Sequence, residues 1–285
     1  MTPLRKRLIE EIALRGYSDK TKEAYVHAVA GLAAYYSRSP DQLSDEQTRS
    51  YLVQLHLRGD KAASTLNVAV SGLRFFYRFV LHREFYHIER AMPRVQRAKR
   101  RPKAYSKAQI ERLLSAGCAQ PKHRAFLMTV YGAGLRLNEA CHLRPEHIDR
   151  ANGQIRIEQG KGRKDRYTVL PQRLLRELEE YWRMYRPAGG WLFPSSQDPK
   201  APMPDGTAQK IFYNAVKRSG LPDKGGIHCL RHSFATHWLE ARLPLFVLKR
   251  MLGHTSLSTT STYLHVSREH LATIKSPLDV LDQER

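Results

Sequence analysis

The chain has 285 residues, and its 48 Lys and Arg outnumber its 27 Asp and Glu to give a formal net charge of +21. A basic excess of this size indicates a polyanionic partner, with nucleic acid the first candidate and an anionic membrane surface the second. Three dispersed cysteines without a CxxC pair argue against a disulfide framework or a zinc knuckle, and no stretch approaches the roughly 20 apolar residues of a membrane span.

Residues 1–92 carry the pattern of a small helical bundle. Apolar residues recur at helical spacing in four stretches, and Ser18 and Ser44 stand at the N-cap positions of the second and third. Gln47 is placed to complete a capping box with Ser44. The fourth stretch, residues 63–83, is rich in aromatic side chains. These could form a platform for base stacking, but their helical spacing in a small bundle favours a place in the core.

A proline-bracketed basic segment follows, with the sequence PRVQRAKRRPK at residues 93–103. It has six basic residues, no acidic residue and no hydrophobic pattern, which is typical of an interdomain linker. Such charge runs are usually solvated, although a linker between two basic domains is also well placed to cross a DNA backbone. The candidate DNA-binding residues here are Arg97, Lys99, Arg100 and Arg101.

Beyond this segment, a run of helices begins with Ser106 as the first N-cap residue, and a β-hairpin interrupts this run. GQIRIEQ and RYTVLP alternate apolar and polar residues, which predicts two strands with Ile155 and Ile157 set against Tyr167 and Val169. We therefore expect a mainly α-helical protein with a small β-sheet. The turn GKGRKD presents three basic residues at the hairpin tip, namely Lys161, Arg163 and Lys164. Arg163 and Lys164 are candidate DNA-binding residues.

Two stretches combine a helix boundary with cations or histidines. In GAGLRLNEACHLR, Arg136 stands at a helix start, where it can face a phosphate together with backbone N–H groups. Glu139 could hold its guanidinium in place, and the alternative is an ordinary surface ion pair. In GIHCLRHSFATHWLEA, His228, Arg231 and His232 fall on one helical face.

The histidines at positions 228, 232 and 237 raise the alternative of a zinc site, because two histidines four residues apart on a helix suit a metal. No Glu lies inside the pair and no third ligand is obvious nearby. A phosphate clamp explains the composition better, because Arg binds two oxygens at once and His exchanges a proton near neutral pH.

LGHTSLSTTSTYLHV, residues 252–266, adds His254 directly after Gly253, an expected C′ glycine of a helix, and Tyr263 nine residues later. Its many hydroxyl side chains are poor helix formers. One interpretation is a well-capped surface helix. The other is a helix of low stability that presents Tyr263 and withdraws it again.

Together these residues have the chemistry that phosphoryl transfer without a metal needs. A tyrosine phenol can act as nucleophile and form a covalent phosphoester, while Arg side chains stabilise the non-bridging oxygens. A Lys or His must then protonate the leaving 5′ oxygen.

The chain resembles the tyrosine recombinases, the family that contains the Xer recombinases and phage lambda integrase. The motifs that carry the resemblance are GLRLNEACHL, GKGRKDR, HCLRHSFATHWL and LGHTSLSTTSTYLHV, in the family's order. It implies that Arg136 and Arg231 bind phosphate and that Lys161 is the general acid. It further implies that His228 accepts the proton of Tyr263, the nucleophile, and that His254 bonds the scissile phosphate.

The resemblance also implies an organisation and partners. Residues 1–92 would form a SAM-like core-binding domain, 93–104 the linker, and 105–285 a mixed α/β catalytic domain. The last would end in a tail that docks on a neighbouring protomer through Ile274 and Leu278. Strand exchange would pass through a Holliday junction, without cofactors, in a homotetramer on double-stranded DNA with inverted-repeat-type core sites. The implied location is the cytoplasm, in association with the nucleoid.

The target sequence, the biological outcome and the involvement of an accessory protein or a second recombinase stay open. Two rival classes of protein also remain. A non-enzymatic DNA-binding protein accounts for the charge and the bundle, but not for the joint presence of all six candidate catalytic residues. A type IB topoisomerase shares the chemistry and acts as a monomer without paired sites.

Overall fold

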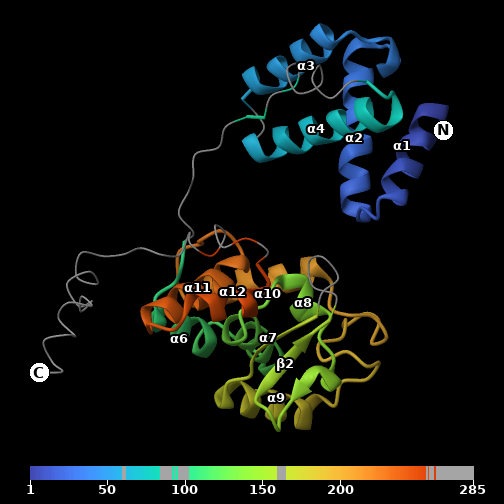
Figure 1. Cartoon of the computed structure of the whole chain (residues 1–285). Helices are drawn as coiled ribbons and strands as arrows, with labels where there is room; N and C mark the ends of the chain where they lie inside the picture. Colours follow the sequence, from blue (N-terminus) through green and yellow to red (C-terminus); the bar gives the residue numbers. More distant parts are fainter. Residues whose placement is uncertain are drawn as a thin grey trace, which may run out of the picture. The chain divides into compact units, whose positions relative to one another are not determined.

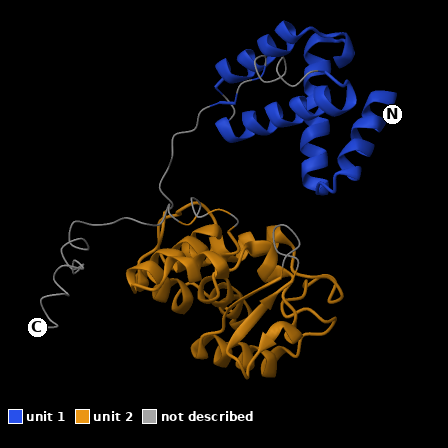
Figure 2. Ribbon diagram, in the orientation of Figure 1, with its two compact units in different colours: residues 1–100 blue, residues 101–285 orange. Residues whose placement is uncertain are grey.

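The chain forms two compact units, residues 1–100 and 101–285, in this computed structural model (Figures 1 and 2). Each unit has a hydrophobic core of its own. None of the helices in the described part of the chain combines the length and the apolar character needed to span a bilayer. The structure describes residues 1–59, 62–83, 92, 94–95, 103–158, 165–254, 256 and 260.

The described part of the first unit is helical, and the serine caps expected from its sequence are present. The Ser18 side chain accepts a hydrogen bond from the backbone of Thr21, and Ser44 and Gln47 form a reciprocal capping box. The elements are α1 (Pro3–Leu14), α2 (Asp19–Tyr36), a 3-10 turn η1 (Pro40–Gln42), α3 (Asp45–Leu57), α4 (Ala63–Phe75) and a π-helical turn η2 (Phe76–Val80).

The aromatic residues at the end of α4 lie in the core of this unit, as their spacing predicted. Phe76 and Tyr77 are fully buried, and the Tyr77 hydroxyl lies 2.8 Å from the buried Thr48 hydroxyl. Helices α2 and α4 pack closely, because Gly72 brings its backbone to a position where a Cβ would lie only 3.0 Å from the Tyr25 Cα. A base-stacking role for these buried rings is therefore excluded.

The second unit combines helices with a three-stranded antiparallel sheet of order β1-β2-β3. Helix α7 is buried from Ala125 to Val130 and contacts both α9 and α11. The elements are α6 (Lys107–Ser115), α7 (Pro121–Gly132), α8 (Leu137–Cys141), a 3-10 turn η3 (Pro145–His147), β1 (Ile148–Asp149), β2 (Gln154–Ile157), β3 (Arg166–Val169), α9 (Gln172–Tyr185), α10 (Asp205–Arg218), α11 (His228–Glu240) and α12 (Leu245–Leu252).

The register of the hairpin corrects the expected pairing. The two isoleucines of β2 lie opposite Arg166 and Thr168, not Tyr167 and Val169. Residues directly opposite each other share one face of the sheet, so Arg166 and Thr168 are buried while Tyr167 is 53% exposed. The pattern of apolar residues was misleading because a charged residue with a buried partner, Arg166, takes the inward position.

Candidate active site

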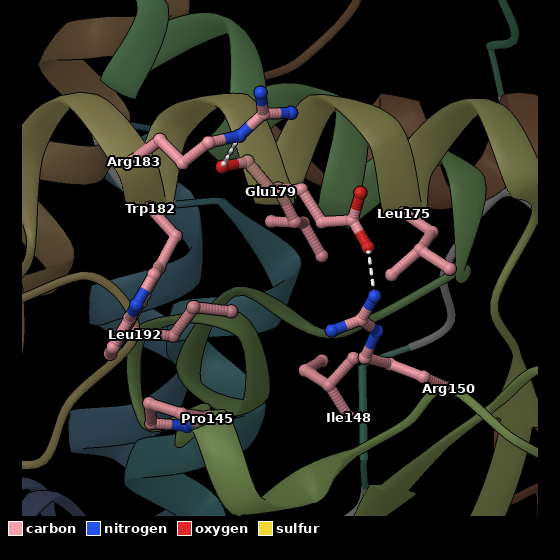
Figure 3. Close-up of a pocket in the computed structure, with 9 residues that line it drawn as sticks. Pro145, Ile148, Arg150, Leu175, Glu179, Trp182, Arg183 and Leu192 are labelled. Atoms are coloured by element: carbon pink, nitrogen blue, oxygen red, sulfur yellow. Dashed lines mark hydrogen bonds and ion pairs between the residues drawn. The ribbon is translucent and has the colours of Figure 1, made fainter.

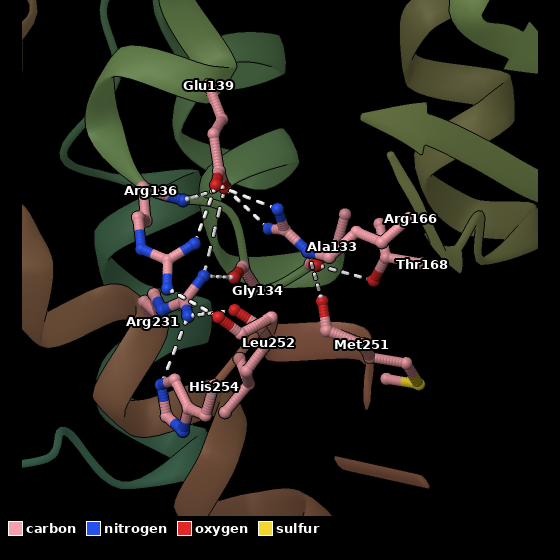
Figure 4. A network of polar contacts seen from close by, with 11 residues as sticks. Ala133, Gly134, Arg136, Glu139, Arg166, Thr168, Arg231, Met251, Leu252 and His254 are labelled. Atoms are coloured by element: carbon pink, nitrogen blue, oxygen red, sulfur yellow. Dashed lines mark hydrogen bonds and ion pairs between the residues drawn. The ribbon is translucent and has the colours of Figure 1, made fainter. Parts of the chain in front are cut away.

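Four of the candidate catalytic residues lie in the described part of the second unit, and three of them form one polar network (Figure 4). Arg136 is the residue before α8, Arg231 lies on α11, and His254 follows the end of α12. Arg231 donates to the carbonyl of Gly134 at 2.8 Å and lies 3.2 Å from Nε2 of His254. The loop before α8, helix α11 and the end of α12 therefore meet at this site.

Glu139 is the centre of the network and faces three guanidinium groups. One of its oxygens lies 2.8 Å from Nη1 of Arg136, and Arg166 donates to both oxygens at 2.9 and 2.7 Å. Arg231 approaches to 3.8 Å. Glu139 also accepts from the backbone N–H of Arg136 at 2.8 Å, as a residue in the first turn of a helix can. It thus orients the Arg136 backbone and side chain together.

The charge balance of this network favours an anion. Burial raises the pKa of Glu139, but the hydrogen bonds and charge of Arg166, together with those of Arg136, outweigh it and bring that pKa to about 2. Among the described residues, three guanidinium groups face this one carboxylate, so positive charge is in excess. A phosphate at this place would therefore be attracted by the net charge of the site.

The end of α12 supplies backbone acceptors to the same arginines. Arg166 donates to the carbonyl of Met251 at 2.8 Å, Arg231 to that of Leu252, and Arg136 to that of Gly253 at 3.0 Å. Carbonyls at a helix C-terminus carry partial negative charge, so cations are stabilised there. Each of the three arginines is thus anchored to a different peptide group.

Gly253 ends α12 in a left-handed conformation, with φ of 61°, which confirms the expected C′ glycine. A Cβ at this position would lie 2.9 Å from Cδ of Arg166. A glycine is therefore required twice over, by its backbone angle and by the close passage of the Arg166 side chain.

His254 lies between an arginine and a hydroxyl. Its Nε2 faces Arg231, and its Nδ1 lies 2.9 Å from the hydroxyl oxygen of Thr260. Burial, and then the charges of Arg231 and Arg136, lowers the pKa of His254 to about 4. The imidazole is therefore neutral near pH 7.

His228 and His232 lie one turn apart on α11, with ring centroids 5.4 Å apart. His228 is exposed, yet desolvation by the surrounding chain, followed by the charges of Arg231 and Arg136, lowers its pKa. Burial, and then the charge of His228, lowers the pKa of His232 to about 4. Near neutral pH, both rings are therefore neutral.

The third histidine of the zinc alternative, His237, has a partner of its own. Nδ1 of His237 is 2.9 Å from the hydroxyl of Tyr131, which satisfies it inside the fold. Among the residues that the structure describes, no group of His, Cys, Asp and Glu side chains is arranged to hold a metal ion.

Two members of the network could not be identified from the sequence. In the sequence, Arg166 looks like a polar residue at the start of a strand, and Thr260 is one of many hydroxyl residues in its segment. The one available signal was that Arg166 is the last residue of the GKGRKDR motif, which also contains the candidate catalytic residue Lys161. The remaining candidates lie outside the described residues, namely Lys161, Arg163, Lys164, Tyr263, Arg97, Lys99, Arg100 and Arg101.

A separate pocket lies on the second unit between α9 and the chain that enters β1 (Figure 3). Ile148, Leu175, Trp182 and Leu192 give it an apolar lining, and an ion pair of 2.7 Å joins Arg150 to Glu179 at its edge. None of the candidate catalytic residues lines it.

Two known protein-family domains match the chain. Residues 103–270 match the phage integrase family, and residues 4–86 match the phage integrase N-terminal SAM-like domain. A putative integrase/recombinase of Sinorhizobium fredii, y4qK, is 36% identical over 282 residues, which cover 99% of this chain and 90% of the relative. The tyrosine recombinase XerA of Pyrococcus furiosus is 30% identical over 275 residues, covering 94% and 92%.

Both the domain matches and these relatives define a tyrosine recombinase, an enzyme class that performs site-specific recombination of DNA. The chain belongs to the phage integrase family. The expectations of family, fold class and enzyme class are confirmed, and a purely DNA-binding protein is excluded.

Solved structures agree on the fold. A Tn1549 transposon integrase in complex with circular intermediate DNA has a TM-score of 0.72 at 17% identity and covers 95% of this chain and 98% of that one. A lambda integrase dimer bound to a COC′ core site also has a TM-score of 0.72, at 19% identity, with 90% and 95% covered.

Proposed function

We propose that the chain cleaves and rejoins DNA strands through a 3′-phosphotyrosine at Tyr263, without a metal or a nucleotide cofactor. The observation that carries this proposal is the convergence of Arg136 and Arg231 on Glu139, with His254 beside Arg231, because it creates a net positive site next to a neutral histidine. Arg136 and Arg231 hold the non-bridging oxygens of the scissile phosphate and stabilise the charge that builds up on them.

In the cleavage step, the Tyr263 oxygen attacks phosphorus while His228 accepts the phenolic proton. The bond from phosphorus to the 5′ oxygen breaks, and Lys161 donates a proton to that oxygen. The products are a 3′-phosphotyrosine and a free 5′-OH. The lowered pKa of His228 supports its role, because a histidine that is neutral at pH 7 can accept a proton.

Strand exchange follows by the reverse reaction. The free 5′-OH of a partner strand attacks the phosphotyrosine, so the bond energy is conserved and no nucleotide is consumed. Two successive exchanges through a Holliday junction complete recombination in a homotetramer. The hydroxyl-rich segment before Tyr263 would let subunit contacts insert or withdraw the nucleophile, so that two of four subunits are active at a time.

Double-stranded DNA with inverted-repeat-type core sites is the proposed partner. Relatives of similar fold are bound to DNA in solved structures, among them lambda integrase on its COC′ core site. In this proposal residues 1–92 bind the core site, residues 93–104 cross the DNA backbone and residues 105–285 hold the chemistry. The net charge of +21 supports extensive phosphate contacts.

The test is a covalent trap on nicked DNA taken from the sequence flanking the gene, with a metal chelator present. We expect protein that stays joined to DNA after denaturation, and no adduct from Tyr263→Phe. Tyr185→Phe is the matched control, because Tyr185 is an exposed residue at the end of α9 and does not belong to the network, so this variant should cleave like the wild type. An adduct formed by Tyr263→Phe would overturn the assignment of the nucleophile.

A further inference from the structure

Both ring nitrogens of His254 have a partner within the protein. Nε2 lies 3.2 Å from Nη2 of Arg231, and Nδ1 lies 2.9 Å from the hydroxyl oxygen of Thr260. Thr260 is fully buried and stands three residues before Tyr263 in the sequence. A buried hydroxyl against an active-site histidine constrains where that histidine can carry its proton.

The partners define the tautomer of the resting enzyme. A guanidinium group donates hydrogen bonds and accepts none, so Nε2 of His254 must accept from Arg231. The ring is neutral near pH 7, because burial and the nearby arginines lower its pKa to about 4. Its one proton therefore lies on Nδ1 and is donated to the oxygen of Thr260.

The proposed reaction needs the other tautomer. A phosphate oxygen only accepts hydrogen bonds, so His254 can bond the scissile phosphate only with a proton on Nε2. Nδ1 must then accept a hydrogen bond from its own partner. A hydroxyl group can turn from acceptor to donor without moving its oxygen, whereas a carboxylate, an ammonium group or a carbonyl cannot.

We propose that Thr260 is a positioning residue that permits His254 to exchange tautomers when the scissile phosphate replaces the contact with Arg231. The inference rests on the proposed function, in which His254 bonds the phosphate and Tyr263 attacks it. The ring releases the Nδ1 proton to water and takes one from water on Nε2, so its charge does not change. The Thr260 hydroxyl then donates to Nδ1.

The test compares Thr260→Val, which removes the hydroxyl at nearly constant volume, with Thr260→Ser, which keeps it. Thr129→Val is the matched control, because Thr129 is equally buried in the same unit and its hydroxyl donates to a carbonyl within α7. We expect Thr260→Val to cleave nicked DNA about 100-fold more slowly, as when one donor is removed from an oxyanion site. Thr260→Ser and Thr129→Val should stay close to the wild type.

A second readout reports the tautomer directly. In nitrogen-15 NMR spectra of the whole chain, the His254 signals among the 13 histidines are assigned by their loss in His254→Gln. We expect a protonated Nδ1 in the free protein, and a protonated Nε2 after DNA is added in a Tyr263→Phe background, which holds the complex before cleavage. In Thr260→Val the DNA-induced change should be absent.

The inference is overturned if Thr260→Val keeps the wild-type cleavage rate, or if Thr260→Ser is as slow as Thr260→Val while both bind DNA normally. It is also overturned if the His254 tautomer is the same with and without DNA. Failure of the proposed function would look different, because Tyr263→Phe would then still form an adduct, whatever the NMR spectra of the free protein show.

Discussion

Replacing Arg166 with Met isolates the contribution of one buried guanidinium to the site. The side chains of Arg166 and Glu139 are only 8% and 9% exposed, and two hydrogen bonds join them. Breaking a buried ion pair by removing one partner destabilises a protein by about 3–5 kcal/mol, because the other charge stays buried. Since Arg136 still bonds Glu139, we expect the lower end, about 3 kcal/mol.

Urea unfolding followed by tryptophan fluorescence measures this loss in the second unit alone, because all three tryptophans, Trp182, Trp191 and Trp238, lie there. Arg173→Met is the matched control. Arg173 also bonds both oxygens of a carboxylate, that of Glu111, but the two side chains are 60% and 54% exposed. Exposed pairs of this kind contribute at most about 1 kcal/mol.

An Arg166→Met variant as stable as Arg173→Met would refute the reasoning. A double-mutant cycle with Glu139→Gln separates charge from packing, because it isolates the interaction energy of the Arg166–Glu139 pair. We expect the separate losses from Arg166→Met and Glu139→Gln to add to more than the loss in the double variant, because each single change leaves one member of this pair without the other. Additive losses would mean that the effect of Arg166→Met comes from the packing of the arginine stem and not from the buried charge pair.

Three further predictions concern the same unit. The pKa of Glu139 is about 2 in the folded protein, against an ordinary 4.5, so its ionised form contributes about 3 kcal/mol to the free energy of unfolding above pH 4.5. This contribution is lost as the pH falls to 2. Urea unfolding at several pH values should show the loss in the wild type and not in Glu139→Gln. In urea titrations, Gly253→Ala should lose more unfolding free energy than Gly190→Ala. Both glycines have positive φ, but a Cβ at Gly253 would meet Arg166, whereas a Cβ at Gly190 meets nothing within 4 Å. Equal losses of unfolding free energy would contradict the close contact with Arg166. Lys161→Ala should cleave ordinary DNA slowly and recover on DNA with a 5′-sulfur leaving group, which needs no protonation; unchanged cleavage of ordinary DNA would remove Lys161 as the general acid.

Local signals in the sequence were sufficient for much of the helical fold. Ser18, Ser44 and Ser106 each cap a helix in the structure, because capping depends on residues only three positions apart. Gly253 was predicted for a similar reason, since only its own backbone angle was at issue.

The hairpin register and the place of Arg166 in the polar network could not be predicted in this way. The inward position of Arg166 depends on Glu139, which is 27 residues earlier in the chain, and on the carbonyl of Met251, which is 85 residues later. No local pattern encodes such a pairing, so the apolar Tyr167 and Val169 were placed on the wrong face. Thr260 was missed because its role depends on His254 and not on its neighbours.

The anchoring of Arg166, Arg231 and Arg136 on three consecutive carbonyls has a consequence for how this enzyme can vary. A carbonyl is present whatever the side chain, so substitutions at Met251 or Leu252 leave the acceptors in place. A one-residue insertion or deletion near the end of α12 would instead shift all three acceptors at once. As far as these acceptors are concerned, the side chains at positions 251 and 252 can therefore vary, whereas the length of α12 cannot.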